Sequence, residues 1–211
     1  MRDSSGLIDC SRVVPCPCFV EKARAFRQTG TYIQQKGAKL RQTFETFKVI
    51  KGTEDAYNAV KAFAEGTSTK PFLLLYGLVG CGKTHLCNAA AITLNYRGVD
   101  CRLFSVTDLL KRLRQSMNDN TIEQLVDEVE SYQVLILDDF GAEYQTDWAS
   151  ARLFEIIDSR YRAELPLLLT TNYDLKDLPQ RVVSRFCDPA LGDPVLISAP
   201  DYRRRKRNQN K

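Results

Sequence analysis

The sequence of 211 residues contains no apolar run that approaches the roughly 20 residues needed to cross a bilayer. Its longest uninterrupted apolar stretch, Phe72–Tyr76, has the length of a β-strand. The first residues, Met1–Ser5, include an acid where a secretory signal would have a basic region leading into an apolar one. There is also no repeat at a solenoid period. These absences predict a soluble protein of the cytoplasm.

Histidine is nearly absent, and the cysteines are odd in number. The sequence has seven cysteines and one histidine, and several cysteines lie within apolar runs, where they usually behave as small buried hydrophobes. A disulfide framework is therefore not expected. Cys10, Cys16 and Cys18 have the spacing of part of a zinc motif, but tetrahedral zinc needs four ligands. We expect no stable stoichiometric zinc on these three thiols; a flexible terminus and an incomplete metal motif both stay open.

The composition predicts one folded domain with charged appendages. Hydrophobic residues make up 44% and charged residues 27%, an ordinary globular balance, and the length suits one domain plus an appendage. Residues 203–211 carry six positive charges and no acid, and residues 20–51 carry eight basic residues against two acids. Subtraction of these two +6 segments from the total of +4 leaves −8 for the remainder. Such basic attachments suit nucleic acid, although a solvated terminus would carry the same charge.

Apolar runs of strand length alternate with helical patterns along most of the chain. Strands are expected at 72–76, 101–105, 134–137, 167–170 and 195–198, and helices at 54–65, 83–96, 107–117, 121–130, 147–162 and near 179–187. Nearly continuous apolar strands covered by helices are typical of a parallel sheet that is buried on both faces. The pattern therefore predicts an α/β fold of three layers.

A glycine-rich segment follows the first of these strands and opens a helix. Gly77-Leu-Val-Gly-Cys-Gly-Lys-Thr84 matches the phosphate-binding loop, in which glycines let backbone N–H groups surround a polyphosphate at a helix start. Lys83 is expected to bridge the β- and γ-phosphates, and the Thr84 hydroxyl to ligate Mg²⁺. His85 and Cys81 are expected only to fit the first helical turn, with no chemical role of their own.

Two carboxylates follow the apolar strand at 134–137. The carboxyl end of this strand is expected to place Asp138 beside the phosphate loop, where it could hold Mg²⁺ directly or through water. Asp139 should point differently and could polarise an attacking water. Glu143 is a further carboxylate whose role is more consistent with structure than with catalysis. The alternative for the pair is an ordinary turn.

Polar residues also follow the strand at 167–170. Asn172 could reach between the γ-phosphate and the attacking water, or could simply form a turn. Further on, Arg181 and Arg185 have the i, i+4 spacing of one helix face. An arginine at a subunit edge can neutralise charge on the γ-phosphate of a neighbouring subunit. A solvated basic face is the alternative.

A basic cluster at 107–117 is a candidate DNA contact. Lys111, Arg112 and Arg114 follow Phe104, and an aromatic ring beside basic residues could stack on bases while the cations neutralise phosphates. A solvated charged face would have the same composition.

Taken together, these motifs make residues 43–203 resemble the DnaC/IstB-type branch of the AAA+ ATPases, which contains helicase loaders and transposition helpers. The resemblance rests on Thr43-Phe-Glu-Thr-Phe47, Gly80-Cys-Gly-Lys-Thr-His-Leu86, Leu137-Asp-Asp-Phe-Gly-Ala-Glu143, Thr170-Thr-Asn172, Ser184-Arg185 and Asp201-Tyr-Arg203. It implies a three-layer AAA+ P-loop NTPase over 43–203 with a parallel central sheet and a reduced lid. Residues 1–42 would then be an N-terminal remnant with the cysteine cluster, and 204–211 a basic tail.

The resemblance also implies a site. It implies ATP bound by Gly77, Gly80, Cys81, Gly82, Lys83, Thr84 and, as second sensor, Arg203. It implies Mg²⁺ on Thr84 and Asp138, and catalysis by Asp139, by Asn172 as first sensor and by Arg185 as an arginine finger acting in trans.

The implied function is ATP-dependent loading of a replicative DNA helicase onto single-stranded DNA by an ATP-dependent homo-oligomer that has no membrane partner. One alternative is an IstB-like ATPase that assists a transposase on duplex DNA. Another is a nucleotide-switched binding protein with negligible turnover. Because loaders of this type carry an N-terminal helicase-binding domain, we expect either a truncated start or a phage-like short form.

Overall fold

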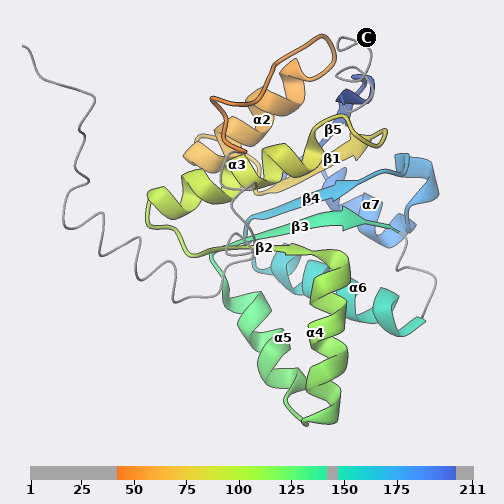
Figure 1. Ribbon diagram of the computed structural model, residues 1–211. Coiled ribbons are helices and arrows are strands. Elements are labelled where there is room, and N and C mark those ends of the chain that lie inside the picture. The colour runs from red at the N-terminus through yellow and green to blue at the C-terminus, as the bar shows by residue number, and fades with distance from the viewer. Residues whose placement is uncertain (1–41, 142–146, 203–211) are drawn as a thin grey trace, which may run out of the picture.

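The computed structural model describes residues 42–141 and 147–202, which form a central parallel sheet between two layers of helices (Figure 1). The strands are β1 (Phe72–Gly77), β2 (Cys101–Ser105), β3 (Val134–Phe140), β4 (Leu167–Thr171) and β5 (Gly192–Ile197), in the order β2-β3-β4-β1-β5. The helices are α2 (Glu54–Glu65), α3 (Lys83–Tyr96), α4 (Val106–Asn118), α5 (Ile122–Ser131), α6 (Asp147–Arg162) and α7 (Gln180–Phe186), with a 3₁₀ turn, η5, at Leu175–Asp177.

This architecture confirms the predicted α/β fold with a parallel sheet. All four strand pairings are parallel. Two strands differ from their predicted bounds by more than one residue. β3 continues through the two carboxylates to Phe140, and β5 begins at Gly192, because Gly192–Pro194 pairs with the start of β1. The reduced lid is expected after Arg185; residues 186–202 of this region are described and include the end of α7 and β5, and residues 203–211 lie outside the described residues.

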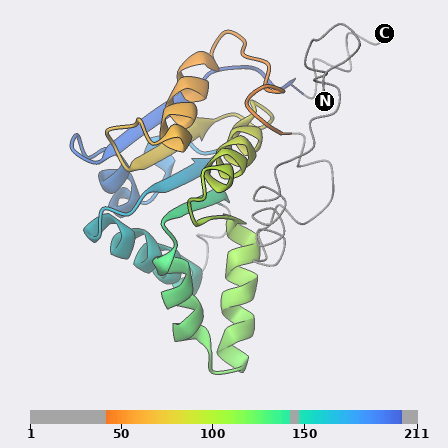
Figure 2. The same ribbon diagram turned by 90° about the vertical axis from the view of Figure 1, so that its left-hand side faces the viewer.

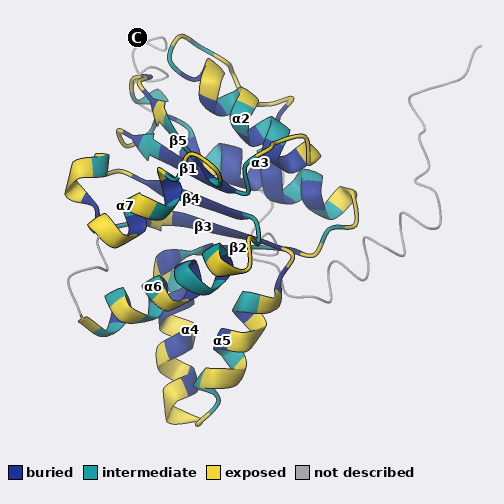
Figure 3. Ribbon diagram, turned by 180° about the vertical axis from the view of Figure 1, so that it is seen from behind, coloured by how far each residue is buried: buried dark blue, intermediate teal, exposed yellow. Residues whose placement is uncertain are grey.

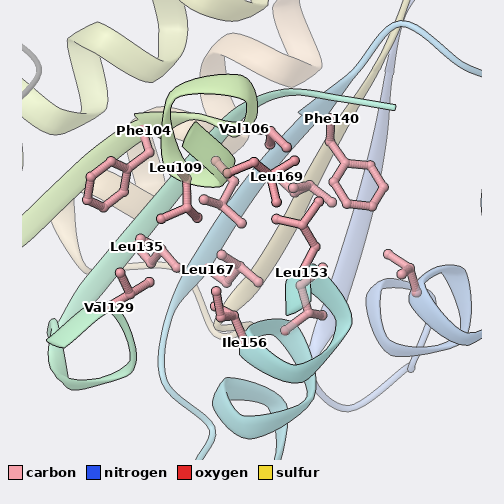
Figure 4. Close-up of a cluster of buried hydrophobic side chains, with 14 of the residues drawn as sticks. Phe104, Val106, Leu109, Val129, Leu135, Phe140, Leu153, Ile156, Leu167 and Leu169 are labelled. Carbon is pink, nitrogen blue, oxygen red and sulfur yellow. The ribbon is translucent and has the colours of Figure 1, made fainter. Parts of the chain in front are cut away.

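The sheet is buried on both faces because successive strand residues point to opposite sides. Leu73 and Leu75 of β1 pack with α2 and α3, whereas Phe72 and Leu74 pack in the cluster formed with α4 to α7. Figure 3 shows β3 and β4 dark blue between the helix layers. Figure 4 shows how Leu135, Leu167 and Leu169 gather with residues of α4 and α6 in the second cluster. Burial of this kind contributes about 1.5–3 kcal/mol for each large apolar side chain.

Helices α4 and α5 form a hairpin that extends away from the sheet (Figures 1 and 2). Helix α4 begins directly after β2. The Ser105 hydroxyl accepts a hydrogen bond from the Asp108 N–H at 3.1 Å and so caps the N-terminus of α4. Leu109, Leu110 and Leu113 are buried, while the opposite face is charged. No helix within 42–141 or 147–202 is both long and apolar enough to cross a membrane.

A buried arginine fixes where β3 and β4 start. The guanidinium of Arg160 on α6 donates hydrogen bonds to the carbonyls of Glu130 at 3.0 Å, Gln133 at 3.4 Å and Pro166 at 2.9 Å. Burial lowers the pKa of Arg160 to about 10. Because this value is still well above neutral pH, the guanidinium stays protonated. Arg160 thereby links the end of α5 to the segments that lead into the two strands carrying the polar residues of the site.

Candidate nucleotide-binding site

A cavity of about 510 Å³ lies where the carboxyl ends of β1, β3 and β4 meet. In open parallel sheets this edge is where ligands bind. The cavity lining includes eight of the predicted site residues: Gly80, Cys81, Gly82, Lys83, Thr84, Asp138, Asp139 and Asn172. The structure therefore brings together in one cavity residues that are far apart in the sequence.

The phosphate-binding loop is held in a conformation that needs its glycines. Gly77, Gly80 and Gly82 have φ angles of 142°, 80° and 107°, which residues with a Cβ rarely adopt. A Cβ at Gly82 would also lie 2.8 Å from the ring of Phe47, and one at Gly80 would overlap the Asp201 carboxylate. The loop leads into α3 through Gly82, which has no side chain to cap the helix. The first N–H groups of α3 are therefore available to an anion.

Lys83 is held inside this loop. Its side chain is only 6% exposed, and its Nζ donates to the carbonyls of Gly77 at 2.7 Å and Leu78 at 2.9 Å. The Sγ of Cys81 lies 3.5 Å from the same nitrogen. The ammonium group thus lies at the floor of the cavity, with its charge compensated by loop dipoles.

The two carboxylates at the end of β3 lie in different environments. Asp138 is 8% exposed and accepts a hydrogen bond from the Thr170 hydroxyl at 2.6 Å. Burial raises the pKa of the Asp138 carboxyl above its ordinary value. Hydrogen bonds from Thr170 and Thr84 oppose this rise in pKa. The side chain of Thr84 therefore lies beside Asp138, as the predicted metal pair requires.

Asp139 is exposed and points elsewhere because the strand bulges at this position. Its φ angle is 65°, a left-handed conformation that costs about 1–3 kcal/mol in residues other than glycine. The Nδ2 of Asn172 donates a hydrogen bond to the Asp139 carboxylate at 2.7 Å. The expected divergence of the two acids is therefore present, and the end of β4 supplies a direct partner for the second acid.

The segment before α2 supplies the ring of Phe47 to the cavity lining. The Nε2 atom of His85 lies 2.9 Å from the Thr43 carbonyl, and the ring of Phe47 stands edge-on to the His85 ring at 5.1 Å. Phe47 also stacks on Tyr57 of α2 at 5.7 Å. Reasoning from the sequence missed this use of His85. The signal available was the Thr43–Phe47 motif, whose polar and aromatic residues needed a partner near the loop.

The last described residues, near Tyr202, form another side of the cavity. The Tyr202 N–H donates to the Gly80 carbonyl at 3.0 Å, and Pro200 and Tyr202 both line the cavity. Several predicted features lie outside the described residues: Arg203, Glu143, the tail 204–211, and Cys10, Cys16 and Cys18.

Arg185 does not line the cavity of its own chain. Its guanidinium forms an ion pair with Asp158 of α6, with the Arg185 Nε 2.9 Å from Asp158 Oδ1. The same group lies 4.5 Å from the centre of the Phe154 ring and 5.5 Å from that of Tyr161. Arg181 also lies over Phe154, at 4.4 Å. Arg185 is thus a fixed side chain on the α6–α7 surface.

The structure contradicts the predicted stacking role of Phe104. This side chain is 6% exposed and belongs to the second core cluster, because it lies on the face of β2 that packs with α4 and α5. The guanidinium of Arg112 lies over its ring at 5.4 Å, and that of Arg114 lies over Trp148 at 5.3 Å. Lys111, Arg112 and Arg114 are exposed, so the cations of the predicted DNA contact are accessible and the aromatic ring is not.

Residues 20–198 match the family of IstB-like ATP binding proteins. Three curated relatives are each 31% identical to the chain. The chromosomal replication initiator protein DnaA of Enterococcus faecalis aligns over 181 residues, which is 82% of this chain and 40% of the relative. An ATP-binding protein in an insertion sequence of Mycobacterium tuberculosis aligns over 64% and 57% of the two chains. The replicative helicase loader DnaI of Bacillus subtilis aligns over 50% and 34%.

Two solved structures resemble the fold. Replication initiator DnaA bound to AMPPCP and single-stranded DNA has a TM-score of 0.66 at 28% identity, and the match covers 76% of this chain and 50% of that one. The DnaC helicase loader has a TM-score of 0.68 at 23% identity, over 77% of this chain and 100% of that one, which indicates a shared fold.

The chain spans between 34% and 57% of the length of the three curated relatives. The family match, in contrast, covers most of this chain, including the loop, the carboxylates and Asn172. The cavity that these residues line is the one in which a P-loop domain binds nucleotide. The chain therefore belongs to the family of IstB-like ATP binding proteins, within the DnaC/IstB-type AAA+ ATPases.

Proposed function

We propose that the domain hydrolyses Mg-ATP in the cavity at the carboxyl edge of the sheet. One observation carries this proposal: the phosphate-binding loop, two divergent carboxylates and Asn172 line a single cavity. Lys83 would neutralise the β- and γ-phosphates, and the free N–H groups at the start of α3 would hold the remaining phosphate oxygens. Phe47 and the segment around it would then contact the base.

The residues beside Lys83 fit Mg²⁺. Thr84 and Asp138 offer a hydroxyl and a carboxylate, the hard oxygen ligands that Mg²⁺ prefers. The described residues contain no cluster of three or more His, Cys, Asp or Glu side chains that could hold a metal, which suits an ion bound jointly by one carboxylate and the nucleotide phosphates. When bound there, Mg²⁺ would stabilise the charge that develops on the phosphates.

Asp139 and Asn172 would act on the attacking water. Asp139 is exposed to the cavity, so its carboxylate can orient a water and accept its proton. Asn172 donates one N–H to that carboxylate and would hold its orientation relative to the γ-phosphate. Arg185 would serve the site of a neighbouring copy, because it does not line the cavity of its own chain and is held on the α6–α7 surface by Asp158. The active form would then be a homo-oligomer that assembles with ATP.

For the cellular role, we propose loading of a replicative helicase onto single-stranded DNA in the cytoplasm. The likeness to the loader DnaI and to DnaA, whose structure holds single-stranded DNA, supports this role. Lys111, Arg112 and Arg114 supply exposed positive charge for such a strand. The family match and the relative from an insertion sequence favour a second candidate, an ATPase that assists a transposase on duplex DNA.

Turnover and partner binding separate these candidates. ATP hydrolysis would be measured with the full chain alone, with single-stranded DNA and with duplex DNA, using Lys83→Ala as the inactive control. We expect Mg²⁺-dependent hydrolysis that single strands stimulate, and capture of a purified hexameric helicase in preference to a purified transposase. Stimulation by duplex DNA with capture of the transposase would overturn the loading role. Nucleotide binding without hydrolysis would indicate a nucleotide-switched binding protein instead.

A further inference from the structure

Thr170 of β4 lies opposite the bulge that contains both carboxylates. β3 and β4 pair in register at Leu137 with Leu169 and again at Phe140 with Thr171. Two residues of β3, Asp138 and Asp139, therefore face the single residue Thr170. Such a bulge interrupts the backbone ladder and leaves the extra residue without its usual partner.

The side chain of Thr170 replaces the missing ladder contacts. Its hydroxyl donates a hydrogen bond to Oδ1 of Asp138 at 2.6 Å and accepts one from the Asp139 N–H at 3.0 Å. Thr170 is fully buried, so water does not compete for this hydroxyl. Because a hydroxyl has one proton to give, its donation to Asp138 leaves its lone pairs for the Asp139 N–H.

These two bonds act on different properties of the site. The bond to Asp138 fixes the direction of a buried carboxylate that also meets Thr84. The bond from the Asp139 N–H holds a backbone with a φ angle of 65°, from which the Asp139 side chain reaches Asn172. One side chain is thus shared by the residue proposed to hold the metal and the residue proposed to orient the water.

We propose that Thr170 is a positioning residue that sets the geometry of Asp138 and Asp139 together. The inference rests on the proposed function for the roles of the two carboxylates, and on the hydrogen bonds alone for the positioning itself. The β-branched shape of Thr170 restricts its side-chain rotamer in a strand, which favours a single hydroxyl direction. Valine would keep the shape and lose both bonds, whereas serine would keep the hydroxyl.

The test compares Thr170→Val, Thr170→Ser and the control Thr171→Val. Thr171 is equally buried, and its hydroxyl accepts a hydrogen bond from the Tyr173 N–H at 3.1 Å. The first measurement is amide hydrogen exchange at Asp139 in the protein without nucleotide or metal. We expect exchange at Asp139 to accelerate at least about 10-fold in Thr170→Val, and to stay near the parent rate in Thr170→Ser and Thr171→Val.

The second measurement is the affinity for a fluorescent ATP analogue with Mg²⁺ and with chelator. Loss of partners that orient a metal ligand typically costs about 10–100-fold in metal affinity or activity. We expect Thr170→Val to lose most of the gain in affinity that Mg²⁺ provides and to lower kcat more than it raises KM. Binding in chelator should stay within about twofold of the parent, because Lys83 and the loop are untouched. Thr170→Ser should recover most of both quantities.

Two outcomes would overturn the inference. One is a folded Thr170→Val with parental exchange at Asp139 and parental Mg²⁺ dependence. The other is an equal loss in Thr170→Val and Thr170→Ser, which would assign the effect to packing of the methyl group. If the parent binds Mg-nucleotide but hydrolyses none, the proposed function fails, while the exchange and Mg²⁺ measurements still decide the role of Thr170.

Discussion

The nucleotide cavity and the α4–α5 hairpin differ in how their functional groups are placed. In the cavity, the predicted site residues follow a strand end or belong to the glycine loop and the start of α3, so the backbone determines where they lie. In the predicted DNA contact at the hairpin, the exposed cations Lys111, Arg112 and Arg114 stand on long side chains, and Phe104 of β2, the aromatic predicted to stack on bases, is in the core. Backbone-determined positions can be inferred from spacing, whereas the availability of a surface side chain depends on packing against neighbours.

Substitution of Lys83 should give the largest effect in the cavity. Lys83→Ala should abolish measurable Mg-ATP binding and turnover, because it removes the ammonium that the Gly77 and Leu78 carbonyls hold inside the phosphate-binding loop. The melting temperature should fall by only a few degrees, since the hydrogen bonds lost are to loop carbonyls and the apolar core is intact. Isothermal titration with ATP, together with thermal melting, checks both points. A folded variant that still binds ATP at full strength would disprove the assignment.

The two carboxylates should give separable defects. Asp139→Asn should keep Mg-ATP binding and reduce hydrolysis about 10²–10⁴-fold, since this is the usual contribution of a positioned base. Asp138→Asn should instead weaken the dependence of nucleotide affinity on Mg²⁺. Steady-state hydrolysis and nucleotide titrations with and without Mg²⁺ distinguish the variants. If the two phenotypes were exchanged, the roles assigned to the buried and the exposed acid would be reversed.

Substitution of Arg185 tests whether this side chain acts on the nucleotide site of a neighbouring chain. Arg185→Ala should spare nucleotide binding and reduce turnover about 10²–10³-fold, as loss of one transition-state donor commonly does. Asp158→Asn should produce a milder version of the same defect, because Arg185 keeps its charge but loses its ion pair. Subunits with an intact Arg185 but with Asp139→Asn should restore activity to the Arg185→Ala subunits when mixed. No recovery in mixed assemblies would indicate a role within one chain.

The fold and the core of the site could be predicted from the sequence because regular elements and motif spacing determine them. The apolar strands, the loop at 77–84 and the pair Asp138 and Asp139 follow from local pattern alone. The register shift between β3 and β4 could not be predicted, since it depends on how two strands align whose paired residues are 31 or 32 positions apart. For that reason the sequence offered no sign that Thr170 would contact both carboxylates.

Contacts between distant segments were equally hard to foresee. The ion pair of Arg185 with Asp158 joins two helices, and the contact of His85 with Thr43 joins residues 42 positions apart. Neither pairing follows from periodicity or propensity, which describe neighbours along the chain. The burial of Phe104 is different, because this residue lies in a strand of a sheet that was predicted to be buried on both faces, and its predicted exposure conflicted with that prediction.

The smallest expected effects belong to the hairpin. If exposed cations on α4 contact phosphates, single substitutions Lys111→Gln, Arg112→Gln and Arg114→Gln should each weaken binding of single-stranded DNA modestly. Each lost contact should also reduce the slope of log affinity against log salt by up to about 0.7. Fluorescence anisotropy with a labelled oligonucleotide at several salt concentrations measures both quantities.

A matched control on α5 sharpens this last test. Glu123→Gln changes the net charge in the same hairpin by one unit in the opposite sense and removes no cation. A general electrostatic effect would make binding to Glu123→Gln tighter at low salt and leave its slope unchanged, because no counterion-releasing contact is lost. Arg112→Gln also removes the guanidinium that lies over the Phe104 ring, and so uncovers one face of that ring. If all three cation substitutions left slope and affinity at parental values, α4 would be a solvated face, and a single strand would have to bind elsewhere.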